Sequence, residues 1–364
     1  MKKAATSIAI GNSASPDLAA QAVHEAMRKA DIKVANSVLL LLTSEFAAAP
    51  QDAIKAAAKA ASCTQVMGCS ASGIFTEDDW VLDAPAAAAM VFGGDFHLMP
   101  PSSAPAHEPL LTLTAPNAIN STWLNNSHAR YGGVSGDAIG QGPFSVWQNA
   151  KGEVSGHVEA YIAGACAVTA CSHGLRRLSQ PQRISQTALF DVLTLDQQSA
   201  LSTLQKAWKF HSKSEDTLPL HMMMAVYADS AEAILKGDFN QTSIIAYDED
   251  NHSVTLAQPL QTGQFLSWCL RDNQVAESDM SLICNRMASS LREAPQFGLM
   301  FSCLGRGPYF YNGIDRDLEI VKHTFPHMPL LGFYGNGEIA KVNGQNQLLP
   351  YSAVLSLFTS QPEI

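Results

Sequence analysis

Stretches of continuous hydrophobic residues alternate along the chain with segments whose apolar positions recur at helical spacing. The continuous stretches are short and are typical of β-strands covered on both faces. The helical segments carry an apolar stripe on one face, and the first of them begins at a capping residue, Ser15, followed by Pro16. This alternation predicts an α+β or α/β fold in which helices cover mixed sheets.

The expected elements extend over most of the chain. Residues 100–128 are rich in Pro, Ser, Thr and Asn, and we expect a long connection there with one short helix. Strands are expected at residues 38–42, 86–92, 157–168, 222–227, 243–247, 253–257, 297–302 and 353–358, and helices at 15–27, 52–61, 196–208, 278–291 and 315–322.

One arrangement of elements occurs in both halves of the sequence. Each copy has an apolar strand, a helix, a segment of the form Gly-x-x-x-x-Gly, and a second apolar strand. The two glycine segments are Gly68–Gly73 and Gly332–Gly337. The identity between the copies is thin, so an ancient duplication and a chance similarity are both open at this point.

Composition and charge narrow the class of protein. Hydrophobic residues make up 46% and charged residues 15% of the 364 positions, which favours a folded chain with a large core. The formal net charge of −10 argues against binding to nucleic acid or to an anionic membrane. No apolar run approaches the roughly 20 residues that cross a bilayer, and the apolar stretch after Lys3 is too short for a signal peptide. We expect a cytoplasmic protein.

The cysteines and the standard catalytic motifs give no sign of a metal site or an enzyme. There are seven cysteines, an odd number, and none forms a C-x-x-C pair, which disfavours both disulfides and structural zinc. The sequence has no P-loop, no H-E-x-x-H and no nucleophile elbow. Cys303 is the one weak candidate nucleophile, so we do not expect catalysis.

Small and polar residues gather at the ends of the apolar strands, where loops expose backbone N–H groups. We expect one pocket there, in which Arg306 binds a carboxylate, Glu338 binds an ammonium, and Phe333 and Tyr334 form an apolar wall. The alternative is a structural ion pair between Arg306 and Glu338. The candidate ligand-binding residues are Cys69, Ser70, Asp137, Ser302, Cys303, Arg306, Phe333, Tyr334, Gly337 and Glu338.

These residues lie in segments that resemble the FIST proteins, sensory modules with an N-terminal and a C-terminal FIST domain in tandem. The most specific segments are Phe301-Ser-Cys-Leu-Gly-Arg-Gly307 and Pro329–Ile339, and others are Gly68–Ile74 and Gly132–Asp137. The resemblance implies two packed lobes, residues 1–194 and 195–364. It also implies an intracellular sensor of small molecules such as amino acids, without a bound cofactor.

The resemblance implies a partner and one alternative function. No output domain is expected within this chain, so a sensor of this build acts on a separate signalling protein, such as a histidine kinase or a cyclic-di-GMP enzyme. Some relatives bind haem and sense nitric oxide. In that case His173 is the first candidate iron ligand and His157 the second, with Arg176 near the propionates.

Overall fold

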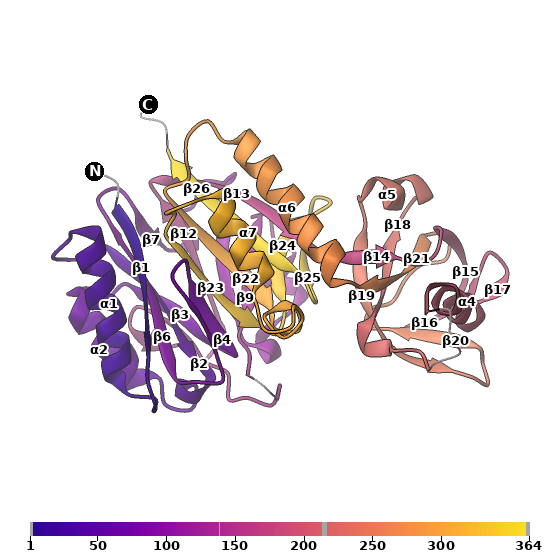
Figure 1. The fold of residues 1–364 in the computed structure, drawn as a ribbon, viewed down its shortest axis with the longest axis horizontal. Helices are drawn as coiled ribbons and strands as arrows, with labels where there is room; N and C mark the ends of the chain where they lie inside the picture. The colour runs from indigo at the N-terminus through magenta and orange to yellow at the C-terminus, as the bar shows by residue number, and fades with distance from the viewer. Residues whose placement is uncertain (1–2, 138, 213–216, 362–364) are drawn as a thin grey trace. The chain divides into compact units, whose positions relative to one another are not determined.

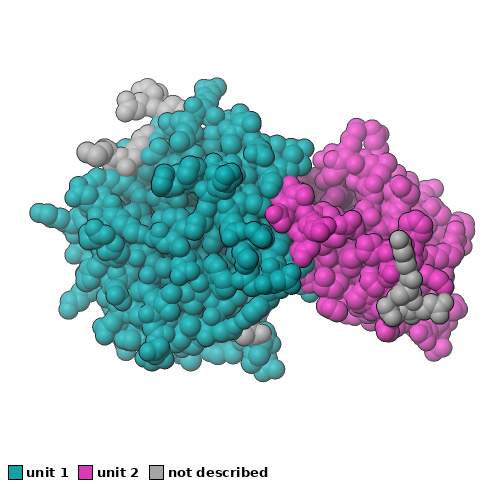
Figure 2. Space-filling model, in the orientation of Figure 1, with its two compact units in different colours: residues 1–172, 280–341, 345–364 teal, residues 173–279, 342–344 magenta. Residues whose placement is uncertain are grey.

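The chain folds into two compact units, seen in a computed structural model that describes residues 3–137, 139–212 and 217–361 (Figure 1). Unit 1 comprises residues 1–172, 280–341 and 345–364, and unit 2 comprises residues 173–279 and 342–344 (Figure 2). The boundary expected at residue 195 falls inside unit 2, so the compact units do not follow it. Unit 2 is inserted into unit 1, and no Pro- or Gly-rich linker marks the places where the chain passes between them.

The first sheet of unit 1 carries two helices on one face. Its order is β1-β6-β2-β3-β10-β11, with β2 and β3 parallel and the other pairs antiparallel. The strands are β1 (Lys3–Ile10), β2 (Ser37–Thr43), β3 (Val66–Ala71), β6 (Ala86–Gly93), β10 (Val146–Gln148) and β11 (Lys151–Gly152), and the helices are α1 (Pro16–Ala30) and α2 (Gln51–Ala61). Alanines let α1 and α2 pack closely on each other and on the sheet.

The second sheet repeats this plan. Its order is β13-β26-β22-β23-β4-β5, with β22 and β23 parallel and the other pairs antiparallel. Helices α6 and α7 cover it with larger side chains, mainly Met, Ile, Leu and Phe. The elements are β4 (Gly73–Thr76), β5 (Trp80–Leu82), β13 (Ala165–Ser172), β22 (Phe297–Cys303), β23 (Leu330–Gly335), β26 (Ala353–Ser360), α6 (Asn273–Ser290) and α7 (Arg316–Thr324).

The structure confirms that one arrangement occurs twice, because β1, β6, β2 and β3 match β13, β26, β22 and β23 in order and direction. Gly68 and Gly332 occupy the same register position in the two copies, opposite Leu40 and Met300. A Cβ at either glycine would lie within 1.7 Å or 2.2 Å of the carbonyl oxygen of its partner. The recurring glycines are thus required by close approach of the backbones, and they lie within strands, not in the loops we expected.

A third sheet of unit 1 has the order β25-β24-β9-β8-β12-β7. It includes a strand within the segment expected to be a connection, and the expected strand 157–168 is in fact two strands that turn at Gly164, where φ is +81°. The strands are β7 (His97–Met99), β8 (Leu110–Thr114), β9 (Arg130–Val134), β12 (His157–Ala163), β24 (Glu338–Val342) and β25 (Gln345–Leu349), and one short helix is α3 (Ser121–Leu124).

The core of unit 1 lies between its sheets. Phe297 of β22 packs against Phe92 of β6 at 5.3 Å between ring centres and stacks on Phe358 of β26 at 4.5 Å. Figure 1 shows α1 and α2 on one side of these sheets and α7 on the other. The result is a layered sandwich of helices, two sheets and helices, which confirms the expected α+β class.

Unit 2 is a ring of antiparallel strands in the order β21-β15-β16-β20-β19-β18, closed by pairing of β18 with β21. Trp268 fills its core, where the indole Nε1 donates to Thr203 Oγ1 at 2.9 Å. The elements are β14 (Leu175–Arg177), β15 (Gln182–Ala188), β16 (Asp191–Leu195), β17 (Gln198–Ser199), β18 (Met223–Ala228), β19 (Asn240–Asp248), β20 (Ser253–Leu256), β21 (Phe265–Arg271), α4 (Ala200–Ser212) and α5 (Ala231–Lys236). In the part of the chain that the structure describes, no helix combines the length and apolarity needed to span a bilayer.

Candidate functional site

The segments that the sequence singled out meet at one end of the unit 1 strands. Backbone N–H groups join them: Ser72 donates to Tyr334 at 3.1 Å, and Asn336 donates to Val134 at 3.0 Å. Val134 in turn donates to the carbonyl of Gly337 at 2.9 Å. The ends of β3, β9 and β23 are therefore neighbours.

The first group of predicted residues has structural contacts at this junction. Ser70 Oγ lies 3.0 Å from Ser135 Oγ and accepts the N–H of Ser145 at 3.0 Å. Asp137 accepts the N–H groups of Gly140 and Gly142, as a turn residue does. Cys69 is fully buried, and burial raises the pKa of its thiol well above the usual range.

Arg306 lies inside the protein with a carboxylate partner of its own. The side chain is 1% exposed, and its Nε and Nη2 bind Asp317 at 2.8 and 3.1 Å. The same guanidinium donates to the carbonyl and the hydroxyl of Ser172 at 2.7 and 2.6 Å. Tyr311 also donates to Asp317, at 2.9 Å. The carboxylate that forms the ion pair with Arg306 belongs to Asp317. The alternative of an ion pair with Glu338 had named a different carboxylate.

The N-terminus of α7 completes this group. Asp315 is the N-cap: its Oδ1 accepts the N–H of Leu318 at 3.0 Å, and its Oδ2 accepts the hydroxyl proton of Tyr334. Burial and the neighbouring charge of Asp317 raise the pKa of Asp315 to about 6. We call the set Ser172, Arg306, Tyr311, Asp315, Asp317 and Tyr334 the Arg306 cluster.

Glu338 is only partly satisfied by hydrogen bonds. The side chain is fully buried; its Oε2 accepts the N–H of Ser352 at 3.2 Å, whereas its Oε1 has no hydrogen-bond partner among the residues that the structure describes. Burial raises the pKa of Glu338 well above its ordinary value, although the charge of Arg306 opposes the rise. A protonated carboxyl avoids much of the cost of a buried charge.

The remaining predicted residues form core rather than an open wall. Phe333 is fully buried and packs edge-to-face on Phe301, with 5.4 Å between the ring centres. Ser302 and Cys303 are buried at the end of β22, and Gly337 adopts a φ of +146° in the turn before β24. The expectation that Phe333 lines an open pocket is therefore wrong, because its strand is covered on both faces.

A hollow of unit 1 lies elsewhere, between the C-terminal ends of α6 and α7. It has a volume of about 580 Å³, within the range of small-molecule sites. Its walls come from the two connections that lead into β22 and β23, so it opens at the opposite ends of these strands from the predicted pocket. It is lined by Ala288, Leu291, Arg292, Glu293, Ala294, Pro295, Gln296, Thr324, Phe325, Pro326, His327, Met328 and Pro329.

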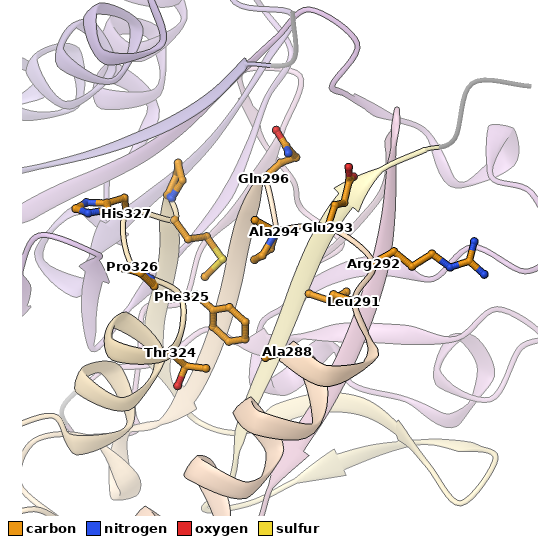
Figure 3. Close-up of a pocket in the computed structure, with 13 residues that line it drawn as sticks. Ala288, Leu291, Arg292, Glu293, Ala294, Gln296, Thr324, Phe325, Pro326 and His327 are labelled. Carbon is orange, nitrogen blue, oxygen red and sulfur yellow. The ribbon is translucent and has the colours of Figure 1, made fainter.

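Apolar and polar residues both line this cavity. Figure 3 shows Leu291 and Phe325 facing the same space, whereas the side chain of Arg292 extends away from it. Phe325 and Met328 are 7% and 5% exposed and belong to the core under α6 and α7. Sequence reasoning missed this site, and the only signal was the group of prolines at 295, 326 and 329, which shape the two connections.

His157 is held by contacts that do not suit an iron ligand. Its ring stacks on Trp123 at 4.0 Å between ring centres, and its Nε2 lies 3.7 Å from Glu159 Oε1. Burial alone would raise the pKa of Glu159, but the neighbouring His157 and the hydrogen-bonded Arg130 lower it to about 2. The imidazole is thus directed at a carboxylate.

The surroundings of His173, the other haem candidate, are also occupied. Its backbone N–H donates to Asp279 at 2.8 Å, and its ring lies 5.4 Å from that of Phe239. Arg176, expected near a propionate, binds Asp272 with 2.6 Å between Nε and Oδ2. His157 and Arg176 thus already face carboxylates of this chain, and a haem would have to displace these contacts.

Comparison with known proteins identifies part of the chain. Residues 200–341 match the family model of the FIST C domain, whereas the N-terminal FIST domain is not detected. An uncharacterized protein of Mycobacterium tuberculosis is 25% identical over 229 residues, and another, of Mycobacterium bovis, is 25% identical over 234 residues. These matches cover 62% and 64% of this chain but only 60% and 61% of the relatives. F-box only protein 22 of Homo sapiens is 29% identical over 103 residues, 28% of this chain and 24% of the relative.

Proposed function

We propose that this protein is a sensory module that binds a small metabolite in the cavity between α6 and α7. The match to the FIST C domain is consistent with a role in signal transduction. The cavity is the observation that carries the proposal, because its volume suits a small molecule and both apolar and polar side chains line it. An amino acid, or a metabolite of similar size with an apolar part and polar groups, suits this mixed lining.

Helix α7 links the cavity to the Arg306 cluster. Its last residue, Thr324, lines the cavity, whereas its first turn contains Asp317, which binds Arg306. Arg306 also holds Ser172, the last residue of unit 1 before the chain enters unit 2. A ligand that shifts α7 would therefore act on the point where the chain leaves unit 1. A separate protein would receive the signal.

A thermal-shift screen with free amino acids and small organic acids, followed by calorimetry, tests the proposal. A ligand that binds only the folded state raises the melting temperature by mass action. Leu291→Trp fills the cavity and is expected to weaken binding of the hit at least tenfold. Leu282→Trp is the matched control, because it makes the same change on an exposed part of α6. Equal binding by Leu291→Trp and the parent protein would overturn the cavity as the site.

The same screen separates the alternatives. If binding fails in Glu338→Gln but persists in Leu291→Trp, the ligand lies near the strand ends, where the sequence placed it. A Soret band on addition of haem would favour the haem alternative. Turnover of an acyl or amide substrate that disappears in Cys303→Ala would make the protein an enzyme. A protein that binds none of these compounds would act as an interaction scaffold.

A further inference from the structure

Strand β13 forms one edge of the second sheet of unit 1. Among residues 3–137, 139–212 and 217–361, its only strand partner is β26. The eight residues of β13 read Ala-Cys-Ala-Val-Thr-Ala-Cys-Ser and include no charge and no proline. Most of its side chains are partly exposed, and Thr169 is exposed. Edge strands of soluble proteins usually carry a charge, a proline or a bulge that prevents pairing with another strand.

Four other edge strands of unit 1, β1, β5, β7 and β11, are protected by charge or by their short length, whereas the five-residue edge strand β25 carries no charge. Edge strands β5, β7 and β11 have only two or three residues, and β5 is flanked by Asp79 and Asp83. Strand β1 is the equivalent of β13 in the first repeat and has the same length. It begins at Lys3, which binds Asp31, and its Thr6 donates to Glu77. The long uncharged edge is therefore a property of β13 and not of the repeat.

The register shows which backbone groups of β13 point away from the sheet. Gln361 donates to the carbonyl of Gly164 at 3.1 Å, in line with the pairing of Ala165 with Ser360. Hydrogen-bonded positions alternate along an antiparallel pair, so the even-numbered residues of β13 face β26. The N–H and C=O groups of Ala165, Ala167 and Thr169 therefore face outward. The short side chains of β13 allow another strand to approach to the usual spacing of about 4.8 Å.

We propose that two copies of this chain pair through β13, antiparallel about a two-fold axis, so that the second sheet of unit 1 continues across both copies. The occupant that we infer is a second copy, because the two-fold register and the absence of charge on β13 allow the strand to pair with itself. The chain carries a net charge of −10, yet β13 set against itself brings no charged side chains opposite each other. A two-fold axis through Ala167 would place Ala165 opposite Thr169 of the other copy, so that outward groups meet outward groups. The proposal does not depend on ligand binding.

Sedimentation velocity of the full chain over a range of concentrations tests the proposal. We expect the parent protein to be dimeric and Ala167→Pro to shift it to a monomer. The proline removes an N–H that faces away from β26, a position at which an edge strand tolerates it. Thr169→Lys adds a charged side chain to the edge strand, a device that blocks pairing with another strand, and should also give a monomer. Gln345→Lys on the exposed edge strand β25 is the matched control and should remain dimeric.

Circular dichroism and melting curves show whether each variant is folded. If Ala167→Pro fails to fold, Thr169→Lys decides the question by the same readout. A parent protein that is monomeric at all concentrations would overturn the proposal, as would folded variants that dimerise as tightly as the parent. A monomeric parent that binds a strand of another protein at β13 would also overturn it.

Discussion

The charge of Arg306 neutralises that of a buried carboxylate, and the loss of either group would destabilise the folded protein. Its guanidinium and Asp317 are both 1% exposed, with 2.8 Å between Nε and Oδ2. Removal of one member of such a pair leaves an uncompensated charge and typically costs about 3–5 kcal/mol. We therefore expect Arg306→Ala to lower the free energy of unfolding by about this amount, measured by urea denaturation. Arg316→Ala, which breaks an exposed pair with Glu319, is the control and should change it by less than about 1 kcal/mol.

Glu338 predicts a pH dependence of stability. Its pKa is raised in the folded protein, so the unfolded chain loses this proton first as pH rises above about 4.5. The parent protein should therefore lose stability with rising pH until the folded carboxyl ionises. Glu338→Gln removes the contribution of this carboxyl to the pH dependence of stability, and its amide oxygen can still accept the N–H of Ser352. The unfolding free energy of the variant minus that of the parent should rise by up to about 1.4 kcal/mol per pH unit.

Urea denaturation between pH 5 and pH 7 measures this difference. Glu45→Gln is the same substitution at an exposed glutamate and serves as the control. The same reasoning applies to Asp315, whose pKa of about 6 confines its effect to the range between about pH 4 and pH 6. A difference for Glu338→Gln that stays constant with pH would show that Glu338 is ionised in the folded protein.

The residue types at the strand ends could be predicted from the sequence, but their partners could not. Arg306 between two glycines after a buried strand pointed to a polar site, and the structure places polar groups there. The partner of Arg306 depends on the approach of α7 and of β13, which brings Ser172 across 134 positions of sequence. The residues next to Arg306 in the sequence do not indicate a contact with a residue so far away. For the same reason, Arg306 was assigned to a ligand and the cavity was missed.

At the scale of elements, the two repeats share one steric requirement. A Cβ at Gly68 or Gly332 would overlap the carbonyl of the neighbouring parallel strand. We therefore expect Gly68→Ala and Gly332→Ala each to lower the free energy of unfolding by at least about 2 kcal/mol, because the overlap involves backbone atoms. Gly152→Ala is the control, since no atom lies within 4 Å of its added Cβ. Chemical denaturation of the three variants checks this, and a near-neutral Gly68→Ala would contradict it.

Elements with a strong pattern were predicted well, and those without one were not. The continuous apolar runs of β2, β6, β22 and β26 and the amphipathic helices α1 and α2 lie where the sequence placed them. Strand β8 was missed because it lies among prolines and polar residues that suggest a loop. The turn between β12 and β13 was missed because Gly164 interrupts an otherwise apolar run without a polar neighbour.

At the scale of the molecule, residues from both halves of the chain form the same sheet. Strands β4, β5 and β13 precede residue 195, whereas β22, β23 and β26 follow it. A cut near residue 195 should therefore leave the two fragments associated. We expect limited proteolysis there to give two bands on a denaturing gel but one native mass in size exclusion. Two separate folded halves would contradict this arrangement.

The insertion of unit 2 also explains why domain organisation was hard to predict. The resemblance to tandem FIST domains suggested a boundary at 195, and the FIST C domain match indeed begins near it, at residue 200. That match ends at residue 341 and so includes parts of both compact units. A family match follows residues that are consecutive in the sequence, whereas a compact unit is defined by contacts in space. Because unit 2 is inserted into unit 1, the boundaries of the match and of the units differ.

The position of β26 sets the order in which the protein can assemble during synthesis. Strand β26 lies between β13 and β22, yet its residues leave the ribosome after all the other strands of that sheet. Unit 2 is almost continuous in sequence, so its ring can close while unit 1 still has a gap in its second sheet. The long-range pairing of Thr169 with Ser356 must wait until β26 has been synthesised. Until then, both edges of the gap are open to other strands, and this interval is when the nascent chain most needs protection from aggregation.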